Sequence, residues 1–181
     1  MNLKTYQAQV AQPREFIDFW ARHYSNPLEH LYSENIDRPL TAESVHHLFE
    51  WKNNGVLSSK KWTSVEEHYV KHIEEVKKLP ETTDAAAFLK QFPNGGPIWR
   101  IFWLHCWRPC RFPIYDQHVH RAMAYIENRQ PNEIPQKDTD KEDQYLKRYL
   151  PFHARFDGVN QRQVDKALWS YGKFLKTNPF F

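Results

Sequence analysis

Glycine is scarce in this sequence, and that scarcity limits the possible folds more than any other feature. Only 5 of the 181 residues are glycine, and two of them, Gly95 and Gly96, are adjacent. A β-sandwich or a barrel needs many tight turns, which commonly use glycine. We therefore predict an all-α chain. Its length suits a single domain, residues 1–181, folded compactly as two small helical lobes that share a core.

The apolar content is concentrated in large side chains. Mean hydropathy is −0.81, yet 15% of the residues are aromatic, a composition typical of a folded domain. Residues 1–10 lack the apolar core of a signal peptide, and no apolar run approaches 18 residues. We expect a cytoplasmic monomer with no membrane contact. Without a secretory signal, Cys106 and Cys110 are interpreted as buried thiols or incidental neighbours and not as a disulfide framework.

Apolar residues at helical spacing, bounded by proline, glycine and capping residues, predict the helices. The predicted helices are 13–24, 41–51, 63–79, 84–91, 97–108, 116–126, 144–150 and 160–175. Candidate N-caps are Thr41, Thr63 (with Glu66 as its capping-box partner), Thr83 or Asp84, Asp116 and Asn160. The polar run 131–143 is predicted to be an exposed loop.

Two motifs flank an apolar helix in the middle of the chain. The first, residues 92–97, reads Phe-Pro-Asn-Gly-Gly-Pro, and the second, residues 112–121, reads Phe-Pro-Ile-Tyr-Asp-Gln-His-Val-His-Arg. Residues 97–108 between them are apolar nearly all round, which indicates a central helix. Together they resemble the core of the helix-hairpin-helix (HhH-GPD) DNA glycosylase superfamily. Its members carry a Leu-Pro-Gly-Val-Gly hairpin, an apolar helix, and then Pro-Val-Asp-Thr-His-Val with an arginine shortly after.

The resemblance covers about a sixth of the chain, within a segment that we assign as residues 84–128. The matching positions are Phe92, Pro93, Gly96, Pro113, Asp116, His118, Val119 and Arg121. Asn94 and Gly95 depart from the inner Gly-Val of the family hairpin. The resemblance implies an all-α, two-lobed fold with a helix-hairpin-helix core and DNA glycosylase activity.

Charge in this region also favours an anionic partner. Between residues 93 and 124 there are four arginines and a single acid, Asp116. A hairpin with two glycines allows close backbone approach, and the following helix N-terminus offers N–H groups to a phosphate. We expect double-stranded DNA with a flipped base as partner. The expected DNA contacts are Asn94, Gly95, Gly96, Arg100, Lys60, Lys61, His118 and Arg121, and the expected base-pocket walls are Trp99, Trp103 and Tyr115.

Asp116 is the catalytic residue that the resemblance implies. A carboxylate can stabilise an oxocarbenium-like transition state and activate water. Relatives with lyase activity place a lysine near the position of Ile98, but this chain has no lysine between Lys90 and Asp116. We therefore predict a monofunctional hydrolase that leaves an abasic site and needs no cofactor. The four-cysteine cluster of some relatives is also missing, so no iron–sulfur centre is expected.

The sequence also allows other interpretations of the possible metal ligands and of Asp116. His68 and His72 have the spacing of a helical zinc pair, but a catalytic glutamate and a third ligand are missing. Cys106 and Cys110 combine poorly with His118 and His120, because those two histidines point to nearly opposite sides of a helix. A further interpretation gives Asp116 the role of a helix cap alone. In that case the chain is a DNA-binding protein that has lost glycosylase activity, or an adaptor that uses its aromatic surface. The sequence does not specify the base, or whether the role is repair or defence.

Overall fold

The computed structural model describes residues 12–128 and 130–178, and over this part the chain is helical with no strand. Helix accounts for 66% of the described residues, which confirms the all-α prediction. The absence of a signal peptide was predicted from residues 1–10, which lie outside the described residues. No helix within the described ranges is long and apolar enough to cross a membrane.

The chain forms two compact units, and the first of them is discontinuous in sequence. The first unit contains residues 1–24 and 113–181, and the second contains residues 25–112. The segment 84–128 is therefore divided between the units. The glycine hairpin belongs to the second unit and Asp116 to the first.

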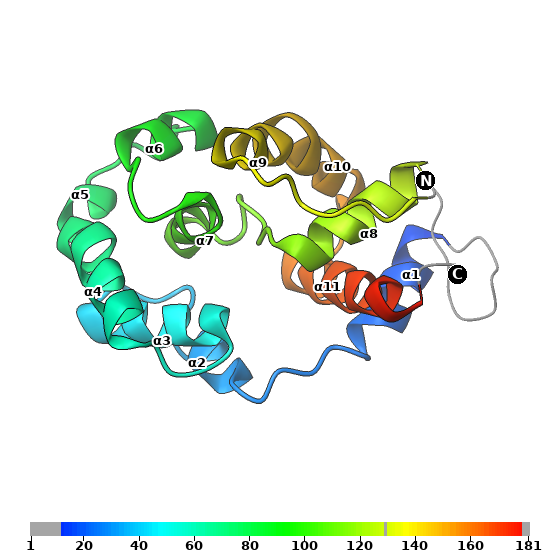
Figure 1. Cartoon of the computed structure of the whole chain (residues 1–181), viewed down its shortest axis with the longest axis horizontal. Coiled ribbons are helices and arrows are strands. Elements are labelled where there is room, and N and C mark those ends of the chain that lie inside the picture. Colours follow the sequence, from blue (N-terminus) through cyan, green and yellow to red (C-terminus); the bar gives the residue numbers. More distant parts are fainter. Residues whose placement is uncertain (1–11, 129, 179–181) are drawn as a thin grey trace. The chain divides into compact units, whose positions relative to one another are not determined.

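The second unit is built around an apolar helix (Figure 1). Its elements are α2 (Glu29–Ser33), α3 (Ala42–Asn53), α4 (Ser59–His68), a 3₁₀ turn (Val70–His72), α5 (Ile73–Lys77), α6 (Ala85–Gln91) and α7 (Pro97–Trp107). Residues 101–106 of α7 are all buried. Figure 1 shows α3 to α6 arranged around α7, as its nearly uniform apolar surface predicted. The short α2 was not predicted.

The predicted helix 63–79 is wrong in its boundaries. Ser58 caps α4 by accepting a hydrogen bond from the Lys61 N–H, so the helix begins four residues before Thr63. The hydroxyl of Thr63 instead bonds back to the carbonyl of Ser59. The helix ends at His68, because Tyr69 leaves helical geometry at φ −129°. The apolar face that predicted this helix comprises Val65, Tyr69, Ile73, Val76 and Leu79. The first four are buried despite the break, and Leu79 is half-buried.

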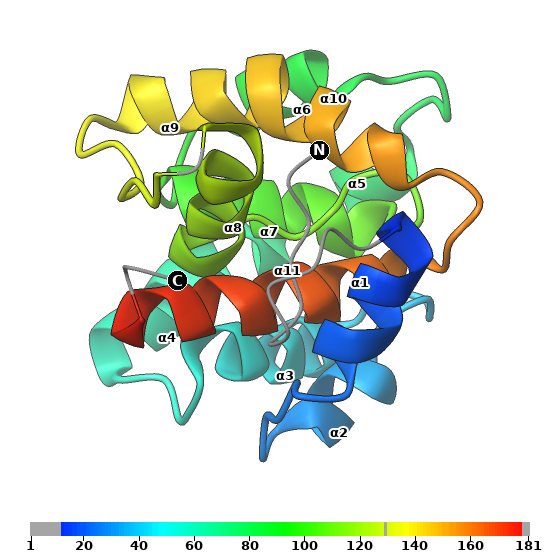
Figure 2. The same cartoon turned by 90° about the vertical axis from the view of Figure 1, so that its right-hand side faces the viewer.

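The first unit is organised on its longest helix. Its elements are α1 (Pro13–Ala21), α8 (Gln117–Asn128), α9 (Asp138–Gln144), a π-helical turn (Tyr145–Tyr149), α10 (Leu150–His153), a 3₁₀ turn (Ala154–Phe156) and α11 (Gln161–Thr177). Both α1 and α8 pack on α11, as Figure 2 shows. The predicted loop 131–143 is wrong from residue 138 onward, where α9 begins. Asp138 and Asp140 in its first turn suit a helix N-terminus.

Candidate active site

The hairpin between α6 and α7 depends on two glycines at positive φ. Gly95 has φ +96° and Gly96 has φ +80°, values that side-chain-bearing residues rarely adopt. Gly96 is the N-cap of α7 and provides no side-chain acceptor, and Pro97 occupies the first helical position. The exposed Asn94 precedes them. The hairpin therefore leads into a helix N-terminus that no side chain caps, as a phosphate site requires.

Tyr69 supports this hairpin from inside the second unit. Its hydroxyl donates to the carbonyl of Gly95 at 3.0 Å, and the side chain is fully buried. Burial raises the pKa of the Tyr69 hydroxyl well above its usual value, so it stays a neutral donor. Apolar spacing identified Tyr69 as buried, but its polar partner lies 26 residues away and was not predicted.

The predicted cations of the second unit occupy different environments. Arg100 is half-buried and donates to the carbonyl of Leu89 at 2.9 Å, which ties α7 to the end of α6. Lys60 and Lys61 are exposed on the first turn of α4. The Lys61 ammonium lies 6.0 Å from the centroid of the Trp99 ring, so α4 brings one cation to the start of α7.

Asp116 lies at the N-terminus of α8. Its Oδ1 accepts hydrogen bonds from the backbone N–H groups of His118 at 2.8 Å and Val119 at 3.2 Å. The side chain is half-buried. The predicted capping role of Asp116 is therefore confirmed, and the cap holds the carboxylate in a fixed position without removing it from solvent.

The structure corrects the prediction that Arg121 contacts DNA. The residue is 2% exposed. Its guanidinium pairs with the Glu133 carboxylate at 2.7 Å and donates to the carbonyl of Gly172 at 2.9 Å. A buried guanidinium with these partners cannot reach a DNA phosphate. Arg121, in α8, instead joins this helix to α11 and to the loop that follows α8.

His118 lies between Asp116 and α11. Its half-buried ring packs edge-on against Trp169, with 5.2 Å between the ring centroids. Desolvation lowers the pKa of His118, and the negative charge of Asp116 opposes that shift. His118 is therefore a neutral, partly accessible ring next to the carboxylate at neutral pH, and it remains a candidate DNA contact.

Two of the three predicted base-pocket walls have no exposed face. Trp103 is 0% exposed and packs against Tyr69 in the core of the second unit. Tyr115 is also 0% exposed, and its hydroxyl bonds with His120 Nδ1 at 2.8 Å. Neither ring can stack on a base in this conformation, so both predictions are corrected. Trp99 is half-buried and keeps accessible surface.

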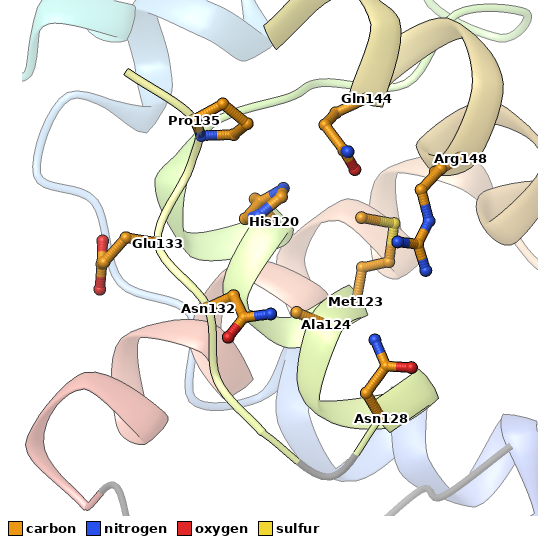
Figure 3. A pocket seen from close by; sticks show the side chains of 9 residues that line it. All are labelled: His120, Met123, Ala124, Asn128, Asn132, Glu133, Pro135, Gln144 and Arg148. Carbon is orange, nitrogen blue, oxygen red and sulfur yellow. The ribbon is translucent and has the colours of Figure 1, made fainter. Parts of the chain in front are cut away.

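A small polar cavity of about 180 Å³ lies beside His120 in the first unit (Figure 3). Its lining residues are His120, Met123, Ala124, Asn128, Asn132, Glu133, Pro135, Gln144 and Arg148. His120 is 5% exposed, and desolvation lowers its pKa. No local pattern in the sequence predicted this cavity, because its lining comes from α8, the loop after it, α9 and the π-helical turn.

Neither of the possible metal sites forms. Among the described residues no group of three His, Cys, Asp or Glu side chains is placed to hold a metal ion. His72 pairs instead with Glu75 at 3.1 Å. Cys106 and Cys110 are both free thiols, the first buried and the second exposed.

Comparison with known proteins gives no neighbour for this chain. No protein-family model, curated protein or solved structure matches it. The resemblance to helix-hairpin-helix glycosylases therefore rests on the residues named above.

Proposed function

We propose that this protein is a monofunctional DNA glycosylase that releases a damaged or modified base in the cytoplasm. One observation carries the proposal. Asp116, at the position that the resemblance assigns to catalysis, is a half-buried carboxylate whose Oδ1 is fixed by two backbone N–H groups of α8. Such preorganised anions stabilise positive charge that develops in a transition state.

The proposed reaction is hydrolysis of the bond between the base and C1′ of the deoxyribose. As that bond breaks, the electron pair leaves with the base, and positive charge spreads over C1′ and the ring oxygen. The Asp116 carboxylate stabilises this charge and accepts a proton from the attacking water. The water oxygen bonds to C1′, and the departing base takes a proton from solvent. The products are the free base and an abasic site.

Contacts to the DNA backbone are assigned to the hairpin and to α4. Backbone N–H groups at the start of α7, together with Asn94, are suited to a phosphate without reading its sequence. Lys60 and Lys61 add exposed positive charge in the same unit. Binding should therefore be strong at low salt and weak at high salt.

The decisive experiment replaces Asp116 in the full chain. Duplex oligonucleotides that carry oxidised, alkylated, deaminated or naturally modified bases are incubated with the protein, and alkali then cleaves any abasic sites. The wild type should release one class of base, and Asp116→Asn should reduce release at least about 100-fold while DNA binding persists. Strand cleavage trapped by borohydride would instead indicate a Schiff base and contradict the monofunctional mechanism.

A DNA-binding protein without catalysis is the second candidate. The observation that favours it is the capping role of Asp116, which gives the carboxylate a structural reason to be present. The burial of Trp103 and Tyr115 points the same way, since two expected base contacts are missing. If wild type and Asp116→Asn bind duplex DNA equally and neither releases any base of the panel, this second function is correct.

A further inference from the structure

The accessible charged side chains of α11 are all cationic. These are Arg162, Lys166, Lys173 and Lys176. The helix has one acid, Asp165, which is 4% exposed and faces His153 at 3.4 Å. The solvent side of α11 therefore carries positive charge that no acid of the same helix offsets.

The four cations and Trp169 form one line along the helix. Residues 162, 166, 169, 173 and 176 are spaced alternately by four and three residues, the spacing of a single helix face. At 1.5 Å per residue this basic stripe is about 21 Å long. The opposite face supplies Val164, Leu168, Tyr171 and Leu175 to the core. Figure 2 shows α11 crossing the first unit, with α1 and α8 against it.

Aromatic rings hold several of these cations in place. The Lys173 ammonium lies 4.8 Å from the Trp169 ring centroid. Lys166 and Arg162 both lie over Tyr24, at 5.1 Å and 5.2 Å. Cation–π contacts restrict the side chains before any ligand binds, which reduces the entropy cost of binding. Lys173 and Lys176 form no ion pair with any residue that the structure describes.

The basic stripe passes beside the start of α8. Trp169, at its middle, contacts the ring of His118, and Asp116 lies two residues earlier in the chain. The positive charges of Lys173 and Lys176 help to lower the pKa of His118, after the larger effect of desolvation. The electric field of the stripe therefore reaches the residues around the candidate catalytic carboxylate.

We propose that the basic stripe of α11 binds the phosphate backbone of DNA and guides the strand to Asp116. This inference rests on the proposed function and adds a binding surface that the sequence did not indicate. A line of cations supported by aromatic rings is the pattern expected of a nucleic-acid surface. An anionic membrane is a poorer partner, because a membrane-bound helix needs an exposed apolar face. The apolar face of α11 is buried in the core.

The test is the salt dependence of binding to an unmodified DNA duplex, measured by fluorescence anisotropy. Lys173→Ala/Lys176→Ala is compared with Lys141→Ala/Lys147→Ala, which removes two lysines of the same unit that pair with Asp138 and Asp143. Each phosphate contact adds about one to the slope of log affinity against log salt. In Lys173→Ala/Lys176→Ala the magnitude of this slope should be smaller than in wild type by about two. Binding should be weaker than that of wild type by about tenfold at 100 mM salt. The control should match wild type.

The outcomes separate this inference from the proposed function. If wild type and both variants bind DNA with equal slopes, the stripe inference is wrong and the glycosylase proposal stands. If wild type does not bind DNA at all, both are wrong. Vesicles of phosphatidylserine and phosphatidylcholine form a second arm. Binding to them that the stripe variant loses, without a change in DNA binding, would assign the surface to membranes and overturn the inference.

Discussion

Gly172 in α11 lies directly against the backbone carbonyl of His118 in α8. A Cβ atom added at Gly172 would overlap the His118 carbonyl oxygen, and backbone atoms cannot move away as a flexible side chain can. The carbonyl of Gly172 also accepts a hydrogen bond from Arg121. This close approach positions the first turn of α8, and with it the Asp116 cap.

Replacing Gly172 by alanine should therefore destabilise the protein. Alanine is a better helix former by about 1 kcal/mol, but overpacking against a rigid backbone costs more. We expect the free energy of unfolding to fall by about 2 kcal/mol, as measured by urea denaturation. Gln163→Ala, at an exposed position of the same helix, should change it by less than about 0.5 kcal/mol. A Gly172→Ala protein as stable as wild type would contradict the close helix crossing.

The ion pair between Arg121 and Glu133 should respond unequally to loss of either partner. The side chain of Arg121 is 3% exposed and that of Glu133 is 67% exposed. Glu133→Ala leaves the buried Arg121 cation without its carboxylate, and the free energy of unfolding should fall by about 3 kcal/mol. Arg121→Met leaves a carboxylate that water can solvate, and should cost about 1 to 2 kcal/mol.

Equal losses in the two variants, measured by urea denaturation, would mean that Glu133 does not compensate the buried charge. Glu127→Ala is a useful comparison, because Glu127 pairs with Arg148 and Arg155, whose side chains are about half exposed. Glu127→Ala should lower the free energy of unfolding less than Glu133→Ala does, since both arginines remain solvated.

Local signals in the sequence predicted most helix starts. Thr41, Asp84 and Asn160 each accept a backbone N–H at the predicted cap, because this interaction depends only on residues two or three positions away. The prediction of Thr63 as a cap was wrong, because Ser58, five residues earlier in the chain, caps the same helix.

Contacts between distant residues decided the rest of the candidate site. Arg121 matched a family arginine, but its partners Glu133 and Gly172 lie 12 and 51 residues away. No local pattern could show that these partners bury it. The glycine inside the apolar pattern of α11 was itself a signal of close backbone approach.

The hydroxyl of Tyr69 should matter more for DNA binding than for stability. Tyr69→Phe keeps the buried ring but removes the hydrogen bond to the Gly95 carbonyl, at a cost of about 1 kcal/mol in unfolding free energy. The hairpin then loses its support from inside, so affinity for duplex DNA should fall several-fold. Tyr32→Phe, which removes a buried bond to His105, is the matched control and should leave affinity unchanged. If Tyr69→Phe binds duplex DNA as tightly as Tyr32→Phe and wild type do, the hairpin does not contact DNA.

Stability should fall as the pH decreases from 7.5 to 5.5. Burial lowers the pKa values of His118 and His120 in the folded state. For His120 the charges of Arg148 and Arg121 add to this effect, while Glu133 opposes it. The folded state therefore binds fewer protons than the unfolded state, whose histidines titrate near about 6.5. The stabilisation is complete above that pH and is lost as the pH falls toward the folded pKa values.

Urea denaturation at several pH values in this range measures the effect. His120→Gln should reduce the slope of unfolding free energy against pH, because the buried ring of His120 no longer takes up a proton on unfolding. His30→Gln, at an exposed position of α2, should leave the slope at its wild-type value. An unchanged slope in His120→Gln would mean that the ring takes up its proton equally well in both states, which its contact with the buried Tyr115 hydroxyl argues against.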